Sequence, residues 1–202
     1  MIRMNEHLKE LLSELRRIHP ELKLIPANLI VVGEWVRWKC RYGCRAYGKH
    51  LCCPPFAPGP EETRRMVSEY RYAALARFQA RAATDLLPQH LHHALWQSLD
   101  EIHRTIFQLE RAAFLAGYYK AFGMGALPCT LCPTCVAEEM TEKGATLQAM
   151  DVLRCRHMDM MRPSLEACGI DVFATIKNAG YSPAVFKDYA ERLELFGLLL
   201  LE

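Results

Sequence analysis

The sequence contains no apolar run long enough to span a membrane. Its longest run, Phe196–Leu201, is interrupted by Gly197, whereas a membrane-spanning helix needs about 20 apolar residues. The N-terminal region also lacks the uninterrupted apolar segment of a secretion signal. We therefore expect a cytoplasmic protein that does not enter the membrane, whose cysteines are kept reduced and are available as metal ligands.

Sequence patterns that mark nucleotide-binding and hydrolytic enzymes are also missing. The chain has no phosphate-binding glycine loop, no dinucleotide fingerprint and no H-E-x-x-H motif, and no Ser-His-Asp arrangement emerges. His90, His92 and His93 cluster where a long helix is predicted to begin, and they favour a solvated helix face. These absences leave the cysteines as the residues that point to a function.

Positive and negative charges nearly cancel over the whole chain, but one window carries positive charge only. The net charge is only +2, which gives the molecule no polyelectrolyte character. Between Glu34 and Glu61 no acidic residue occurs, and the cations there are Arg37, Lys39, Arg41, Arg45 and Lys49. This window either compensates the charge of a metal site, attracts an anionic partner, or is a solvated basic loop.

Aromatic residues in the same window offer a stacking surface for bases. They are Trp35, Trp38, Tyr42 and Tyr47. Aromatic residues before a cysteine-rich loop are more often part of a core, so nucleic acid is not an expected partner.

Cysteine is what the chain has in excess, and eight of its nine cysteines fall into two groups. In the second group, Cys129, Cys132 and Cys135 follow the C-x2-C-x2-C spacing that holds a four-iron cluster (4Fe–4S), with Cys155 as the remote fourth thiolate. Zinc is the alternative, because C-x2-C pairs also build zinc sites, although a third cysteine at this spacing is redundant for them.

The first group contains Cys40, Cys44 and the adjacent pair Cys52 and Cys53. Two neighbouring cysteines do not chelate one metal comfortably, and the prolines that follow favour Cys53 as the placed ligand. A cluster held by Cys40, Cys44 and Cys53 would have one open iron for a substrate or a small ligand. His50 or Cys52 is available to fill that position, and a structural zinc site with three cysteines and one histidine is the alternative.

The pattern of apolar residues predicts one α+β domain over residues 1–202. We expect a single mixed sheet with packed helices, and the two cysteine-rich segments, 37–60 and 126–168, as loops at one end of the sheet. Helices are expected over residues 1–20, from Pro60, over 89–116, over 146–153 and 163–168, and from a cap at Asp171 to about Asn178. Strands are expected at 27–36, 72–78, before Cys129 and at 193–201.

Three stretches resemble a known family, the cysteine-rich predicted metal-binding proteins of domain-of-unknown-function family 2284. They are VRWKCRYGCRAYGKHLCCPP, YYKAFGMGALPCTLCPTC and CRHMDMMRPSLEACGIDVFATIKNAGYSP, and the resemblance extends from about residue 25 to the C-terminus. It implies seven ligands and leaves Cys52 and Cys168 spare. The ligands it implies are Cys40, Cys44, Cys53, Cys129, Cys132, Cys135 and Cys155.

Three functions are compatible with this sequence. The first is a protein with one or two 4Fe–4S clusters that transfers electrons to a redox partner protein or a small-molecule substrate. The second is an enzyme whose three-cysteine cluster is the reactive centre. The third is a zinc-stabilised structural or binding module.

Overall fold

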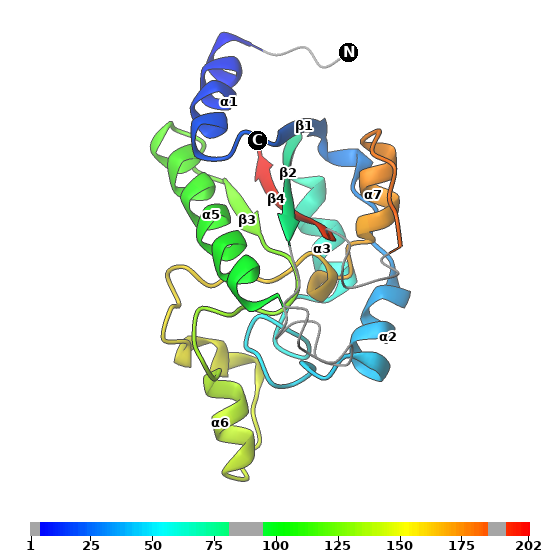
Figure 1. The fold of residues 1–202 in the computed structure, drawn as a ribbon, viewed down its shortest axis with the longest axis vertical. Coiled ribbons are helices and arrows are strands. Elements are labelled where there is room, and N and C mark those ends of the chain that lie inside the picture. Colours follow the sequence, from blue (N-terminus) through cyan, green and yellow to red (C-terminus); the bar gives the residue numbers. More distant parts are fainter. Residues whose placement is uncertain (1–4, 81–94, 186–192) are drawn as a thin grey trace.

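A four-stranded sheet forms the centre of the computed structural model, which describes residues 5–80, 95–185 and 193–202 (Figure 1). The strands lie in the order β1-β2-β4-β3, and each neighbouring pair is antiparallel. The prediction of an α+β fold on one sheet is confirmed, with antiparallel pairing where a mixed sheet was expected. The strands are β1 (Leu22–Pro26), β2 (Tyr72–Ala80), β3 (Phe122–Met124) and β4 (Leu193–Leu201).

Helices cover both faces of this sheet. They are α1 (Glu6–Ile18), α3 (Pro60–Ser68), α5 (Trp96–Leu115) and α7 (Val172–Asn178). Because successive side chains of a strand point to opposite faces, Ala74 and Ala76 of β2 pack with α1 and α5. Ala73 and Leu75 pack on the other side, in a core that includes residues of α3 and α7. Burial on both faces explains why β4 is apolar along most of its length.

Helix α5 lies very close to β4, and a glycine permits this approach. A Cβ atom added to Gly197 would come within 2.5 Å of the Cδ1 atom of Ile106. This distance is too short for a larger residue unless the Ile106 side chain shifts. The close packing fixes α5, which in turn carries two residues that anchor the cysteine-rich segments, His103 and Glu110.

Shorter helices occur around the cysteines. Figure 1 shows α2 and α6 on the side of the molecule away from α1. The sheet therefore has a helical layer on each face and the cysteine-bearing chain beyond one end. The shorter elements are η1 (Ala27–Leu29), α2 (Glu34–Gly43), α6 (Val136–Glu142), η3 (Ala149–Arg154) and η4 (Glu166–Cys168).

The predicted strand at 27–36 is wrong. This stretch contains η1 and the beginning of α2, and Val32 forms only an isolated bridge with Ile170. Gly33 is the N-cap of α2 and Glu34 supplies an acidic first turn, which favours a helix despite the β-branched residues before it. The first strand is instead β1, and Cys40 consequently lies in a helix rather than in an irregular loop.

The remaining predicted elements agree better with the structure. The predicted first helix and the helix from Pro60 correspond to α1 and α3, and the strands expected at 72–78, before Cys129 and at 193–201 correspond to β2, β3 and β4. The Asp171 carboxylate caps α7 as expected, accepting the N–H of Ala174 at 2.9 Å. The predicted helix over 89–116 is confirmed from Trp96, and its first part, with the three histidines, lies outside the described residues.

Candidate metal centre

Five cysteine side chains line one small hollow between the two cysteine-rich segments. One belongs to the first segment and four to the second, so the hollow brings the two groups together. Its volume is about 20 Å³, enough for roughly one water molecule. The lining consists of His50, Leu51, Cys52, Cys129, Leu131, Cys132, Cys135, Cys155, His157 and Met161.

Cys52 connects the two segments directly. Its side chain is only 2% exposed, and its sulfur accepts the backbone N–H of Cys129 with an N–S distance of 3.1 Å. The neighbouring backbone N–H of Leu51 donates to the sulfur of Cys135. The segment around Cys52 therefore forms one wall of the hollow that the C-x2-C-x2-C loop encloses.

The loop before Cys129 rests on helix α5. The Nε2 atom of His103 lies 3.3 Å from the carbonyl oxygen of Pro128. A Cβ atom on Gly125 would come within 2.6 Å of the His103 ring, so only glycine allows this contact. Burial lowers the pKa of His103 to about 4, although the hydrogen bond to Pro128 opposes the shift. The imidazole is thus neutral near pH 7 and serves as a support for the loop.

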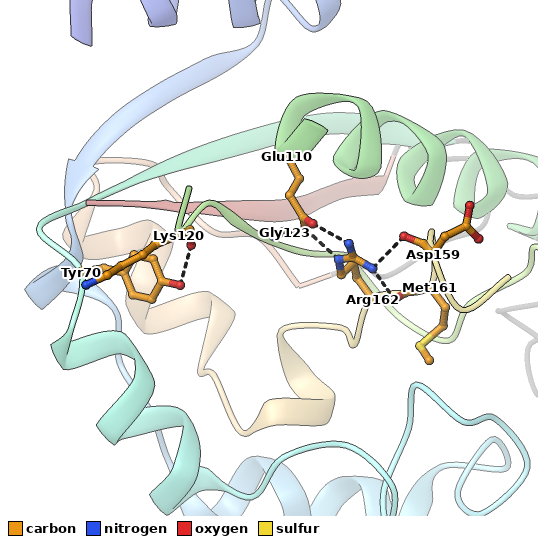
Figure 2. A network of polar contacts seen from close by, with 7 residues as sticks. All are labelled: Tyr70, Glu110, Lys120, Gly123, Asp159, Met161 and Arg162. Atoms are coloured by element: carbon orange, nitrogen blue, oxygen red, sulfur yellow. Dashed lines mark hydrogen bonds and ion pairs between the residues drawn. The ribbon is translucent and has the colours of Figure 1, made fainter. Parts of the chain in front are cut away.

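The chain after Cys155 is anchored by a largely buried ion pair, shown in Figure 2. The guanidinium of Arg162 contacts the Glu110 carboxylate on α5 through two nitrogens. The same carboxylate accepts the N–H of Gly123 at 2.6 Å, which links the pair to β3. Arg162 also donates to the carbonyls of Asp159 and Met161. Arg162 therefore has a structural role in the segment that follows Cys155.

Two more ion pairs lie at the surface, one between the two cysteine-rich segments and one within the second. The Nζ atom of Lys49 lies 3.0 Å from the Glu138 carboxylate, which joins the first segment to α6. Arg156 bonds the Glu139 carboxylate at 2.6 Å and the Thr134 carbonyl at 3.0 Å. These contacts hold the chain on both sides of Cys135, although exposed ion pairs of this kind contribute little to stability.

Four thiols of the hollow, those of Cys52, Cys129, Cys135 and Cys155, have raised pKa values. The hydrogen bond with Cys52, followed by burial, raises the pKa of Cys129. Burial is the main cause for Cys135 and Cys155, and it raises the pKa of each above its ordinary value. These thiols therefore keep their protons at neutral pH, and a metal ion would have to displace the protons when it binds.

The first predicted ligand set is divided between two places. Cys40 and Cys44 are one helical turn apart at the end of α2, with the N–H of Cys44 bonded to the Cys40 carbonyl at 3.3 Å. Both line an open cleft of about 400 Å³ beside Trp35 and Phe173. Cys53 instead packs with Cys52, with their sulfurs 3.8 Å apart, in a buried cluster that contacts Cys129.

Metal binding by Cys40, Cys44 and Cys53 stays a prediction. Burial raises the pKa of Cys40 to about 11, which gives a protonated thiol at neutral pH. The ninth cysteine, Cys168, packs in the core that includes residues of α3 and α7, beside the hydroxyl of Thr63. Its surroundings are those of a core residue.

The donors in the hollow are chemically suited to a soft metal. Thiolates select zinc and iron–sulfur clusters, whereas carboxylates select magnesium and calcium. Among the described residues, no three His, Cys, Asp or Glu side chains are grouped closely enough to hold one metal ion. The five thiols therefore share a hollow without meeting at a single point.

The site so described is that of a cysteine-rich candidate metal-binding protein. The chain belongs to the family described as predicted metal-binding protein (DUF2284), whose model matches residues 23–201. This match confirms the family that the sequence resembles. No curated protein and no solved structure matches the chain. Within the parts of the chain that the structure describes, no helix is both long and apolar enough to cross a bilayer.

Cys52 is the residue that sequence reasoning left out. The adjacent pair was resolved in favour of Cys53 because two prolines follow it, but the structure turns Cys52 towards the second group. The adjacent pair itself was the available signal, since its two sulfurs lie 3.8 Å apart in one cluster that contacts Cys129. Which of the two thiols lines the hollow depends on a turn that the sequence does not reveal.

Proposed function

We propose that the hollow binds an iron–sulfur cluster of the four-iron type and that the protein uses it in redox chemistry. The observation that carries the proposal is the arrangement of Cys129, Cys132, Cys135 and Cys155 around one hollow. Their spacing is that of cluster ligands, and they line a common space without meeting at a single point. A bound cluster would supply a one-electron redox couple.

The residues around the hollow would have defined tasks in that function. His103 and Gly125 hold the loop that begins at Cys129, while Arg162 and Glu110 hold the chain beyond Cys155. The backbone N–H groups of Leu51 and His157 interact with the sulfurs of Cys135 and Cys155 and oppose the rise in their pKa values. Hydrogen bonds to cluster sulfurs help to set the reduction potential, so these two groups are candidates for tuning it.

Zinc is the second candidate, and the size of the hollow favours it. A volume of about 20 Å³ is close to that of one small ligand rather than that of a cluster. A zinc ion would take four of the available thiolates and act as a structural centre. A second centre held by Cys40, Cys44 and Cys53 would, with an open iron, make the protein an enzyme, but Cys53 packs with Cys52, apart from the cleft that Cys40 and Cys44 line.

Metal and sulfide analysis of the anaerobically purified protein tests the proposal. We expect iron and acid-labile sulfide in equal amounts, with a paramagnetic resonance signal after reduction. Cys132→Ser should remove the metal of one centre, whereas Cys168→Ala, which alters a thiol in the core, should leave the metal content unchanged. Stoichiometric zinc without sulfide would decide for the structural zinc site, and unchanged metal in the Cys132 variant would refute the ligand assignment.

A further inference from the structure

Helix α2 exposes its largest aromatic side chains to solvent. Trp38 is 67% exposed, Tyr42 is 77% exposed and Trp35 is 48% exposed, whereas the smaller Val36 is buried. An amphipathic helix normally has the opposite arrangement, with its large apolar residues towards the core. Figure 1 shows α2 at the edge of the molecule, so its outer side is available for a partner.

The three aromatic residues share one side of the helix. At about 100° per residue, positions 35, 38 and 42 fall within a sector of roughly 60°. Val36 and Arg37 lie on the other side, where the Arg37 guanidinium contacts the carbonyls of Pro58 and Ala167. The outer side therefore forms a continuous aromatic stripe.

Positive charge surrounds this stripe. Lys39, Arg41 and Arg45 are exposed, and no ion pair is described for them within the parts of the chain that the structure covers. The Lys39 ammonium lies 5.1 Å from the centre of the Trp35 ring, and the Arg41 guanidinium lies 5.5 Å from that of Tyr42. No acidic residue occurs in the sequence between Glu34 and Glu61, while Asp171 and Glu194 from other segments line the cleft that Trp35 and Lys39 also line.

We propose that this aromatic face, defined by Trp35, Trp38 and Tyr42 with Lys39, Arg41 and Arg45, binds an acidic electron-carrying protein. Tryptophan, tyrosine and arginine are the residues that dominate the energy of protein–protein interfaces. Positive groups around such a patch attract an acidic partner and orient it. The reduced carrier would give one electron to the metal centre and become oxidised itself. This inference rests on the proposed redox function.

Single-stranded nucleic acid fits the same face less well. Proteins that stack successive bases do so in a positively charged groove, whereas these rings stand on the outer side of a helix. Two of the rings already carry a cation from the same helix. The sequence pI of about 8.1 is also below the range typical of nucleic-acid-binding domains.

Calorimetric titration of the metal-loaded protein with a small acidic two-iron ferredoxin tests the inference. We expect binding that weakens with salt. Replacing both Trp38→Ala and Tyr42→Ala should weaken it at least about tenfold, because hot-spot residues supply most of an interface's energy. Arg41→Glu should weaken it strongly at low salt and less at high salt.

Tyr119→Ala is the matched control. Tyr119 is 69% exposed and Lys120 lies over its ring, as Arg41 lies over that of Tyr42. This variant should keep its affinity within about twofold. Absence of ferredoxin binding, or equal affinity of the double variant, would overturn the inference. The inference would also be overturned if oligodeoxythymidine displaced ferredoxin and its own binding required Trp38 and Tyr42. Metal content, measured on every variant, reports separately on the proposed function.

Discussion

His103 makes the stability of the protein depend on pH. Its pKa is lowered to about 4 by burial, while the nearby Asp100 carboxylate favours the charged form and His50 opposes it. The unfolded chain, with an ordinary histidine pKa near 6.5, therefore binds more protons than the folded chain between these values. The contribution of His103 to stability is complete above pH 6.5 and is lost as the pH falls towards 4.

We predict that His103→Gln reduces this acid sensitivity. The amide can still donate to the Pro128 carbonyl but does not titrate. Because His103 stays neutral in the folded chain, the free energy of unfolding of the wild type should be about 2 kcal/mol lower at pH 5 than at pH 7. The variant should not show this decrease. Urea unfolding at the two pH values measures the difference. Equal losses in wild type and variant would show that His103 does not titrate as proposed.

Gly125 offers a second test at a single residue. A methyl group there would come within 2.6 Å of the His103 ring, and such overpacking typically costs about 1–3 kcal/mol. We expect Gly125→Ala to lower the midpoint of urea unfolding and to reduce metal content by displacing the loop before Cys129.

Gly43→Ala is the control for this substitution. No atom lies within 4 Å of a Cβ built at Gly43, and its φ angle is not positive. Alanine at the end of α2 should be neutral or stabilising by up to about 1 kcal/mol. If both glycine variants behaved alike, the contact with His103 would not be the cause of the effect.

Among the elements, α5 holds the second cysteine-rich segment in place through the ion pair between Glu110, on α5, and Arg162. The two side chains are only 17% and 13% exposed, so the pair lies between a surface pair worth less than 1 kcal/mol and a fully buried one. We predict that Arg162→Ala lowers the free energy of unfolding by about 2–3 kcal/mol, because it leaves Glu110 without its countercharge. Metal content should fall with it.

Arg104 on the same helix provides the comparison. It pairs with Asp100 at 2.8 Å in an exposed position, where an ion pair contributes little to stability. Arg104→Ala should therefore leave unfolding and metal content almost unchanged. If Arg104→Ala lowered the free energy of unfolding as much as Arg162→Ala does, the cause would be the loss of an ion pair on α5 in general. It would not be the release of the segment that Arg162 anchors.

The type of an element could be predicted where the spacing of its apolar residues clearly matches a helix or a strand. Three elements are specified by local sequence. They are α1, by its apolar residues at helical spacing, β4, by its continuous apolar run, and α7, by its capping residue. The strand predicted at 27–36 failed because the helix-starting features of Gly33 and Glu34 outweighed the β-branched residues before them. β1 was missed because its burial depends on β2, whose pairing is set by the tertiary structure.

For the whole molecule, metal binding and stability should be coupled. The centre joins segments that are far apart in the sequence, so a metal bound there stabilises only the folded chain. At a free metal concentration of about 100 times Kd this linkage contributes about 2.7 kcal/mol. We predict that a chelator lowers the thermal unfolding midpoint of the wild type. The Cys132→Ser variant should unfold at the same temperature with and without chelator.

The candidate centre was predictable in part at this scale. Cys129, Cys132 and Cys135 could be predicted to belong to one ligand group, because the spacing that indicates it is a local feature of the sequence. The approach of Cys52 was not predictable, since it joins residues 77 positions apart. Such a contact depends on the path of both segments over the end of the sheet, and no local pattern records that path.

The position of β4 in the chain has a consequence for biosynthesis. β4 pairs with both β2 and β3, yet it follows all nine cysteines in the sequence. During translation every thiol leaves the ribosome before the strand that completes the sheet, and chains emerge at only about 5–20 residues per second. The nascent chain therefore carries its thiols unprotected for a short time. A centre that needs the complete sheet can form only after β4 has left the ribosome.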